Sequence, residues 1–228
     1  MYSLNPIPYH DFVLPNGIVK ERNEGLVDIT EYKNSKIIVD FAYYRRGVPY
    51  SIDKCLMRKS VAEKLMNASL KLPEGLCFKI FDAWRPFEVQ QQLFSQYREK
   101  VKAQNPLMSN TEIDLQTQKF VSKPLKSLEN SPVHSTGGAI DLTLATLDGK
   151  ELKMGTEFDD FSLKAYTAYY ENEENQEIEI RNNRRVLYNV MISEGFTNLP
   201  TEWWHFDYGD KFWAYYTNNV AFYSGIFK

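Results

Sequence analysis

Histidine and cysteine are scarce in this chain of 228 residues, which holds three histidines and two cysteines. Cys55 and Cys77 stand alone, a pattern that favours buried thiols over a disulfide framework and leaves the cellular compartment undecided. No apolar run approaches the roughly 20 residues that a membrane-spanning helix requires. The scarcity of histidine matters most, because any chemistry that uses imidazole groups must draw on only three of them.

The chain also lacks an excess of basic charge. Its formal net charge is −3, so it offers no positive field for nucleic acid. Residues 1–24 hold prolines and mixed charges and do not show the basic and then apolar layout of a signal peptide. We therefore expect a cytoplasmic protein that binds no nucleic acid and has no membrane span. A periplasmic location is the alternative if a signal peptide was removed.

Hydrophobic residues make up 43% of the chain, enough to bury the core of a single domain over residues 1–228, with residues 1–35 as an irregular arm. Val61, Leu65, Ala68 and Leu72 repeat at helical spacing and predict a helix over residues 60–72, with Ser60 and Glu63 as a capping box. The remaining pattern predicts an extended run at 37–44, strands at 76–82, 139–144 and 202–208, helices from Pro86 and at 181–194, and polar loops at 103–131 and 171–179.

The predicted strands lack the continuous aliphatic runs of a buried parallel sheet. The pattern therefore predicts an α+β fold, with a mostly antiparallel sheet flanked by helices. Within the strand at 139–144, Ile140, Leu142 and Leu144 face one way, whereas Asp141 faces the other. This alternation directs the Asp141 carboxylate away from the core.

Two short segments hold the residues with the most distinctive chemistry. His134 precedes the Gly137-Gly138 turn and Asp141 follows it, and glycine permits the tight reversal that would bring the two side chains together. Glu202 and His205 form the second segment. Two imidazoles and a carboxylate are a common ligand set for catalytic zinc, which leaves a fourth position open for water. Glu202 would then be the base that this water needs.

Some residues near these segments have alternative interpretations. Glu202 and His205 would point to opposite faces of an ideal strand, but Pro200 indicates that the strand only starts at Glu202. Asp207 shares a face with His205 and is the next candidate for the base. Arg85 lies between a strand and a helix, where it either stabilises negative charge on a substrate oxygen or caps the strand. We interpret His10, the third histidine, as a surface residue.

The chain resembles a known family in motifs spread over most of its length. It is similar to the zinc D-alanyl-D-alanine dipeptidases of the VanX type, within the DD-peptidase group. The matching segments are Cys55-Leu56-Met57-Arg58-Lys59, Asp82-Ala83-Trp84-Arg85-Pro86, His134-x-x-Gly137-x-Ala139-x-Asp141, Met154-Gly155-Thr156-x-Phe158-Asp159, Asn183-Arg184-Arg185, Gly195-Phe196 and Glu202-Trp203-Trp204-His205-Phe206.

The resemblance implies a hedgehog/DD-peptidase-like fold with one zinc ion per chain at a face of the sheet, and a small dipeptide as substrate. It implies that His134, Asp141 and His205 bind the zinc and that Glu202 is the catalytic base. It further implies that Arg85 stabilises the tetrahedral intermediate and that Asp159 binds the free amino group of the dipeptide. One departure is Pro132, which stands where the family has a substrate-binding serine. The N-terminal arm has no counterpart in the family pattern.

Two other functions fit parts of the same pattern. A carboxypeptidase or endopeptidase that acts on peptidoglycan stem peptides would use the same zinc site, and the length of the substrate would distinguish it from a dipeptidase. A zinc-stabilised binding module without turnover is a further alternative. Glu202 argues against that module, because a structural zinc site fills its fourth position with protein. The sequence indicates neither the oligomeric state nor the physiological role.

Overall fold

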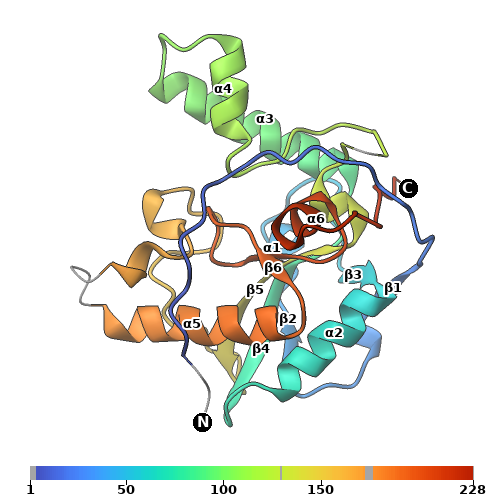
Figure 1. Ribbon diagram of the computed structural model, residues 1–228, viewed down its shortest axis with the longest axis vertical. Coiled ribbons are helices and arrows are strands. Elements are labelled where there is room, and N and C mark those ends of the chain that lie inside the picture. The colour runs from blue at the N-terminus through green and yellow to red at the C-terminus, as the bar shows by residue number, and fades with distance from the viewer. Residues whose placement is uncertain (1–3, 129, 173–176, 228) are drawn as a thin grey trace.

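The computed structural model describes residues 4–128, 130–172 and 177–227 (Figure 1). Its helices and strands are β1 (Leu26–Asp28), η1 (Ile29–Glu31), β2 (Ile37–Val39), α1 (Ala42–Arg45), β3 (Leu56–Arg58), α2 (Lys59–Leu70), β4 (Leu76–Asp82), α3 (Phe87–Gln104), α4 (Asn110–Thr117), η2 (Val133–Thr136), β5 (Ala139–Thr146), η3 (Leu163–Ala165), η4 (Tyr169–Glu171), α5 (Ile178–Ser193), β6 (Thr197–Asn198), β7 (His205–Asp207) and α6 (Lys211–Thr217).

A five-stranded sheet in the order β2-β4-β5-β7-β6 lies at the centre of the fold. β2 pairs with β4 in parallel, and every other pair in this sheet is antiparallel. β1 and β3 form a separate two-stranded antiparallel sheet. The predicted α+β fold with a mostly antiparallel sheet is therefore confirmed. Among the described residues, no helix is both long and apolar enough to cross a bilayer.

Helices α2 and α5 share one hydrophobic core with the central strand β5 (Figure 1). From β5 the core takes Ile140, Leu142 and Leu144, the three residues predicted to face it. Each large aliphatic side chain buried in this way contributes about 1.5–3 kcal/mol. Asp141 lies between them in sequence and points to the opposite face, so the packing that holds β5 also fixes the direction of Asp141.

Several predicted elements differ from the structure. The Ser60–Glu63 capping box does not form, because α2 begins at Lys59, and Ser60 instead contacts the side chains of Glu24 and Tyr223. The extended run at 37–44 is only β2, followed by α1, and the strand at 202–208 is only β7. The irregular arm is shorter than predicted, because β1 and η1 fall within residues 1–35. The glutamate-rich segment at 171–179 lies partly outside the described residues.

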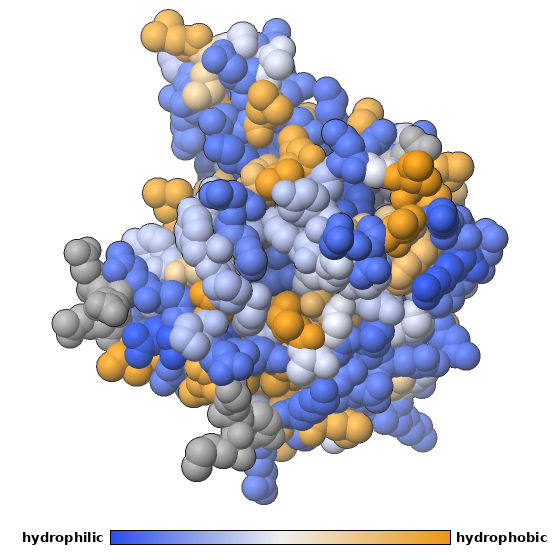
Figure 2. Space-filling view, in the orientation of Figure 1, coloured by the Kyte–Doolittle hydropathy of each residue, from blue (hydrophilic) through white to orange (hydrophobic). Residues whose placement is uncertain are grey.

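The largest difference is α4, which lies inside the predicted loop at 103–131. Ser109 caps this helix by accepting a hydrogen bond from the Glu112 amide, and the Glu112 carboxylate accepts one from the Ser109 amide. This capping box is a signal that the sequence contained. Together with the adjoining end of α3, α4 projects from the body of the molecule (Figure 1). The face shown in Figure 2 is mostly hydrophilic, with apolar residues scattered over it.

Candidate active site

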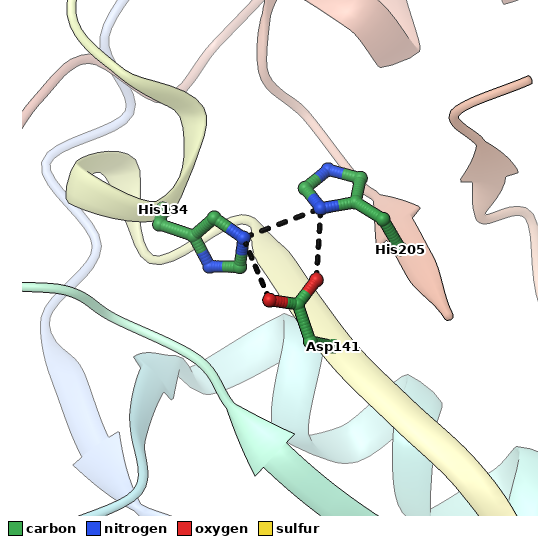
Figure 3. A group of neighbouring side chains, drawn as sticks. All are labelled: His134, Asp141 and His205. Carbon is green, nitrogen blue, oxygen red and sulfur yellow. Dashed lines mark hydrogen bonds and ion pairs between the residues drawn. The ribbon is translucent and has the colours of Figure 1, made fainter. Parts of the chain in front are cut away.

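His134, Asp141 and His205 converge on one point, although they come from η2, β5 and β7 (Figure 3). His134 Nε2 lies 3.2 Å from His205 Nδ1. The two carboxylate oxygens of Asp141 lie 3.3 Å from His134 Nε2 and 2.9 Å from His205 Nδ1. The register of the sheet explains part of this arrangement, because Asp141 of β5 is paired directly with His205 of β7. The structure thus brings all three predicted ligands together.

The outer nitrogen of each imidazole is held by the protein. His134 Nδ1 lies 2.7 Å from the Ala83 carbonyl oxygen, which can only accept, so this nitrogen carries the proton. His205 Nε2 donates in the same way to Asp207 Oδ1, at 2.8 Å. Both rings therefore direct their other nitrogen toward Asp141, and hydrogen bonds of this kind orient histidines that bind metals.

The buried charges around this point are strongly coupled. Burial raises the pKa of Asp141, but the neighbouring His134 and His205 lower it more, so that it lies well below its usual range. Burial lowers the pKa of His205, but Asp207 and Asp141 together raise it well above its usual value. The site therefore stabilises positive charge placed between these side chains.

The donor set fits a zinc ion. Bonds of about 2.0–2.2 Å in tetrahedral geometry place neighbouring donor atoms roughly 3.3–3.6 Å apart. His134 Nε2 and His205 Nδ1, 3.2 Å apart, come close to that spacing. With one oxygen of Asp141 as the third donor, the three atoms all lie within 4.8 Å of one another. All three side chains are also buried.

Glu202 lies beside these three residues, in the loop between β6 and β7. Its Oε2 is 3.9 Å from His205 Nδ1. Its Oε1 is buried and has no hydrogen-bond partner. Burial raises the pKa of Glu202 well above its usual value; His205 opposes this rise and Asp141 adds to it. A buried, unpartnered carboxylate oxygen with a raised pKa is what a base acting on water near neutral pH requires.

Arg85 is buried and held on several sides. Its Nε donates to Asp82 at 2.7 Å, and its Nη1 donates to Gln90 at 2.8 Å. Its Nη2 lies 3.3 Å from Asp141 Oδ2 and 3.4 Å from the Tyr43 hydroxyl. The sequence left open whether Arg85 is a surface cap, and the structure excludes that possibility. Instead, a fixed guanidinium stands next to the three converging side chains.

Asp159 lies on the same cavity and already has partners. It accepts hydrogen bonds from the Tyr43 hydroxyl, at 3.1 Å, and from Arg46 Nη1, at 2.6 Å. Burial raises its pKa to about 6, although Arg46 and Arg85 act in the opposite direction. Its backbone adopts a positive φ of 67°, which is uncommon outside glycine. Any cation that binds at Asp159 would therefore also meet Arg46.

These residues line one cavity of about 330 Å³. His134, Asp141, His205 and Glu202 lie on its wall together with Arg85 and Asp159. Apolar and aromatic side chains supply most of the remaining wall: Phe12, Tyr43, Val48, Leu93, Tyr97, Phe120, Val121, Val133, Phe161, Leu199, Trp204 and Phe212. A cavity with this mixture suits a small ligand that has charged ends and apolar side chains.

The sequence profile of the family Peptidase M15, described as D-ala-D-ala dipeptidase, matches residues 42–223. This chain belongs to that family. The M15 D-Ala-D-Ala dipeptidases are metallopeptidases, in agreement with the converging imidazoles and carboxylate.

Three proteins named D-alanyl-D-alanine dipeptidase are similar to this M15 chain. The Synechocystis protein is 30% identical over 212 residues, covering 86% of this chain and 83% of its own length. The Escherichia coli protein is 27% identical over 159 residues, covering 69% of each. The Enterococcus faecium protein is 29% identical over 165 residues, covering 71% of this chain and 77% of its own length.

Two solved structures are also similar. One is a zinc-bound variant of the vancomycin-resistance D,D-pentapeptidase VanY, with a TM-score of 0.45 and 14% identity over 90% of this chain and 95% of that one. The other is VanYB in complex with D-alanine-D-alanine, with the same TM-score and identity over 90% of this chain and 93% of that one.

Sequence reasoning missed two residues of this M15 site and considered a third, Asp207, in another role. Tyr43 was assigned to an extended run, yet from α1 its hydroxyl contacts both Asp159 and Arg85. Arg46 follows α1 and pairs with Asp159. Asp207, weighed as a second candidate for the base, instead contacts the outer nitrogen of His205. Only Asp207 carried a signal, because it shares a strand face with His205.

Pro132 occupies the position at which the family pattern has a serine. It is the residue before η2, and as a proline it offers neither a hydroxyl nor an amide proton. Its neighbour Ser131 is buried. Within the described part of the chain, the cavity wall holds Ser122 and not Ser131. The hydroxyl nearest in sequence to His134 on its N-terminal side is therefore not on the cavity.

Proposed function

We propose that this protein hydrolyses D-Ala-D-Ala or a similar small dipeptide, with one zinc ion per chain held by His134, Asp141 and His205. The observation that carries the proposal is the convergence of these three side chains beside the unpartnered oxygen of Glu202. Membership of the M15 family supports the reaction, and the names of the curated relatives support the substrate.

The bound zinc would polarise the scissile carbonyl and lower the pKa of a water molecule from about 15.7 to near 7. Glu202 takes the proton of the attacking water and passes it to the leaving amine. The raised pKa of Glu202 suits the first step, because it makes this carboxylate a stronger base than an ordinary one.

Arg85 would stabilise the negative charge that builds on the carbonyl oxygen, and Asp159 would bind the positive charge of the substrate amine. Asp82 and Gln90 fix the guanidinium of Arg85, so it needs no rearrangement when negative charge builds on the carbonyl oxygen. Asp159 pairs with the free ammonium group of the dipeptide. Because Asp159 is largely desolvated, an amino-terminally blocked peptide would lose a strong, charge-assisted interaction.

The test is the release of alanine by the zinc-loaded protein from three substrates: D-Ala-D-Ala, L-Ala-L-Ala and a pentapeptide ending in D-Ala-D-Ala. Rapid hydrolysis of D-Ala-D-Ala alone would support the proposal. Hydrolysis of the pentapeptide at the same rate would contradict the dipeptidase function and favour a carboxypeptidase with the same metal site. Zinc binding without turnover of any of the three would favour a binding module.

A further inference from the structure

The N-terminal arm, defined as residues 4–25, passes across the body of the molecule (blue in Figure 1). It lies outside the segment that matches the family profile, which begins at residue 42. Its first part is fixed to α5 and η4: Asn189 Nδ2 donates to the Asn5 carbonyl, and the amide of the buried Ile7 donates to Glu171. The arm is therefore anchored before it reaches the active site.

The second part of the arm is anchored as well. The amides of Lys20 and Arg22 donate to the carbonyls of Ala221 and Phe222, at 2.8 and 3.1 Å. The Glu21 carboxylate accepts from the amide and the hydroxyl of Ser224, at 2.6 and 2.5 Å. The segment between residues 7 and 20 is thus held at both ends, which limits how far it can move from the surface beneath it.

Phe12 lies in this held segment, and its side chain lines the active-site cavity. It packs against the cluster of Val133, Ala139, Leu199 and Phe212, with its ring centroid 6.2 Å from that of Phe212. The preceding residue, Asp11, is held as well, because its carbonyl accepts a hydrogen bond from the Tyr216 hydroxyl. Val133 is adjacent to His134 in the chain, and Phe12 and His134 line the same cavity, so the arm contributes to the wall of the cavity that holds the proposed metal ligands.

The cavity has two ends, which the order of the strands identifies. Asp159 is hydrogen-bonded to Tyr43 of α1, and α1 packs beside β4. Phe12 packs on Phe212 of α6, and α6 packs beside β6. The strands that carry Asp141 and His205 lie between β4 and β6 in the sheet. The converging side chains therefore stand between the Asp159 end and the Phe12 end.

We propose that Phe12 closes the cavity at the end opposite Asp159 and thereby restricts the enzyme to substrates with one residue after the scissile bond. The inference rests on the proposed function. With the substrate ammonium on Asp159 and the scissile carbonyl at the three ligands, the leaving residue points toward Phe12. Asp159 then limits extension at the amino end, and Phe12 limits it at the carboxyl end.

The experiment compares D-Ala-D-Ala with D-Ala-D-Ala-Gly, counting cleavage of the first peptide bond in the zinc-loaded protein. We expect Phe12→Ala to raise kcat/KM for the tripeptide relative to the dipeptide by about tenfold or more, since a pocket discriminates by roughly 10–200-fold for each methylene it rejects. Phe12→Trp should give no such gain. Ile18→Ala, an exposed apolar position on the same arm, is the matched control and should leave the ratio unchanged.

An unchanged ratio in Phe12→Ala, or a native protein that cleaves both peptides equally well, would overturn the inference. Failure of the native protein to cleave D-Ala-D-Ala would instead count against the proposed function. In that case, calorimetric dissociation constants of the two peptides for the native protein and Phe12→Ala test the wall alone. Tripeptide binding that improves only when Phe12 is truncated supports it, and equal binding by both proteins contradicts it.

Discussion

At the scale of single residues, the arrangement of hydrogen bonds decides which atoms are available for chemistry. The Ala83 carbonyl and the Asp207 carboxylate take one nitrogen of each imidazole, leaving the other nitrogen for a metal. Asp82 and Gln90 likewise accept hydrogen bonds from Arg85 Nε and Nη1. This leaves Nη2, which faces Tyr43 and Asp141. Glu202 Oε1 differs from these groups in having no partner. Asp207 Oδ2 also has no partner, but Asp207 lies on the outer nitrogen of His205, so the water is assigned to Glu202 Oε1.

This assignment predicts the behaviour of Glu202→Gln. The amide is nearly isosteric but cannot accept a proton, so zinc content should be retained while kcat falls by about 10²–10⁴-fold, the contribution typical of general acid–base catalysis. Metal analysis and steady-state kinetics on the same preparation measure both quantities. Glu157→Gln, at an exposed position, is the control. A Glu202→Gln variant with native kcat would mean that another group is the base.

Asp159 predicts a pH dependence. Its pKa is raised to about 6 by burial, above the ordinary value of 3.8. As the pH falls through about 6, the carboxylate becomes neutral and can no longer pair with an ammonium group, so kcat/KM for D-Ala-D-Ala should decline on the acidic side. kcat/KM reports groups of the free enzyme.

Two matched variants show how much of the acidic decline in kcat/KM comes from Asp159 and how much from other groups. Asp159→Asn should have a lower kcat/KM at neutral pH and should lose the part of the decline that Asp159 causes. Asp160→Asn, at the neighbouring position, should keep the native profile. An acidic limb identical in Asp159→Asn and the native protein would show that Asp159 does not bind the substrate amine.

At the scale of elements, the sequence predicted best what short-range patterns determine. The bounds of β4 and the inward face of β5 follow from alternation along one strand, and both are confirmed. The convergence of His134, Asp141 and His205 could be proposed because the chemistry of a ligand set does not depend on the fold. Tyr43 and Arg46 could not be found, because their contact with Asp159 joins residues more than 100 positions apart.

The loop between β6 and β7 also depends on a contact that the sequence did not reveal. Asn198 Nδ2 donates to the carbonyls of Glu202 and His205, at 3.1 and 2.9 Å. It thereby fixes the base and one ligand relative to each other. Asn198→Ala removes this donor from both carbonyls, each of which still accepts from a backbone amide. A typical hydrogen bond of this kind contributes about 0.5–1.5 kcal/mol.

We therefore expect Asn198→Ala to lower both the free energy of unfolding and kcat. Asn183→Ala is the matched control, since its amide donates to one carbonyl, that of Lys153, at an exposed site on α5. It should have little effect on either quantity. Denaturant titration and kinetics measure the two effects, and native kcat in Asn198→Ala would show that the loop keeps its geometry without this side chain.

At the scale of the whole molecule, the site joins segments that are distant in the sequence and are held only by the fold. η2, β5 and β7 each supply one proposed zinc ligand, and the arm and α6 each supply a side chain to the cavity wall. A ligand that binds only where these segments meet binds the folded state and not the unfolded one. Folding and metal binding must then be linked, with a stabilisation of RT ln(1 + [L]/Kd).

Zinc should therefore raise the melting temperature of the metal-free protein. At a free concentration of 1,000 times Kd the gain is about 4 kcal/mol, and a chelator should reverse it. Asp141→Ala removes one of the three proposed zinc ligands and should abolish the shift in melting temperature. Asp53→Ala, at an exposed position, should keep the shift. Calorimetric melts with and without zinc measure the difference. Because the shift needs no substrate, an equal shift in Asp141→Ala and the native protein would place the zinc elsewhere, whatever the fate of the proposed reaction.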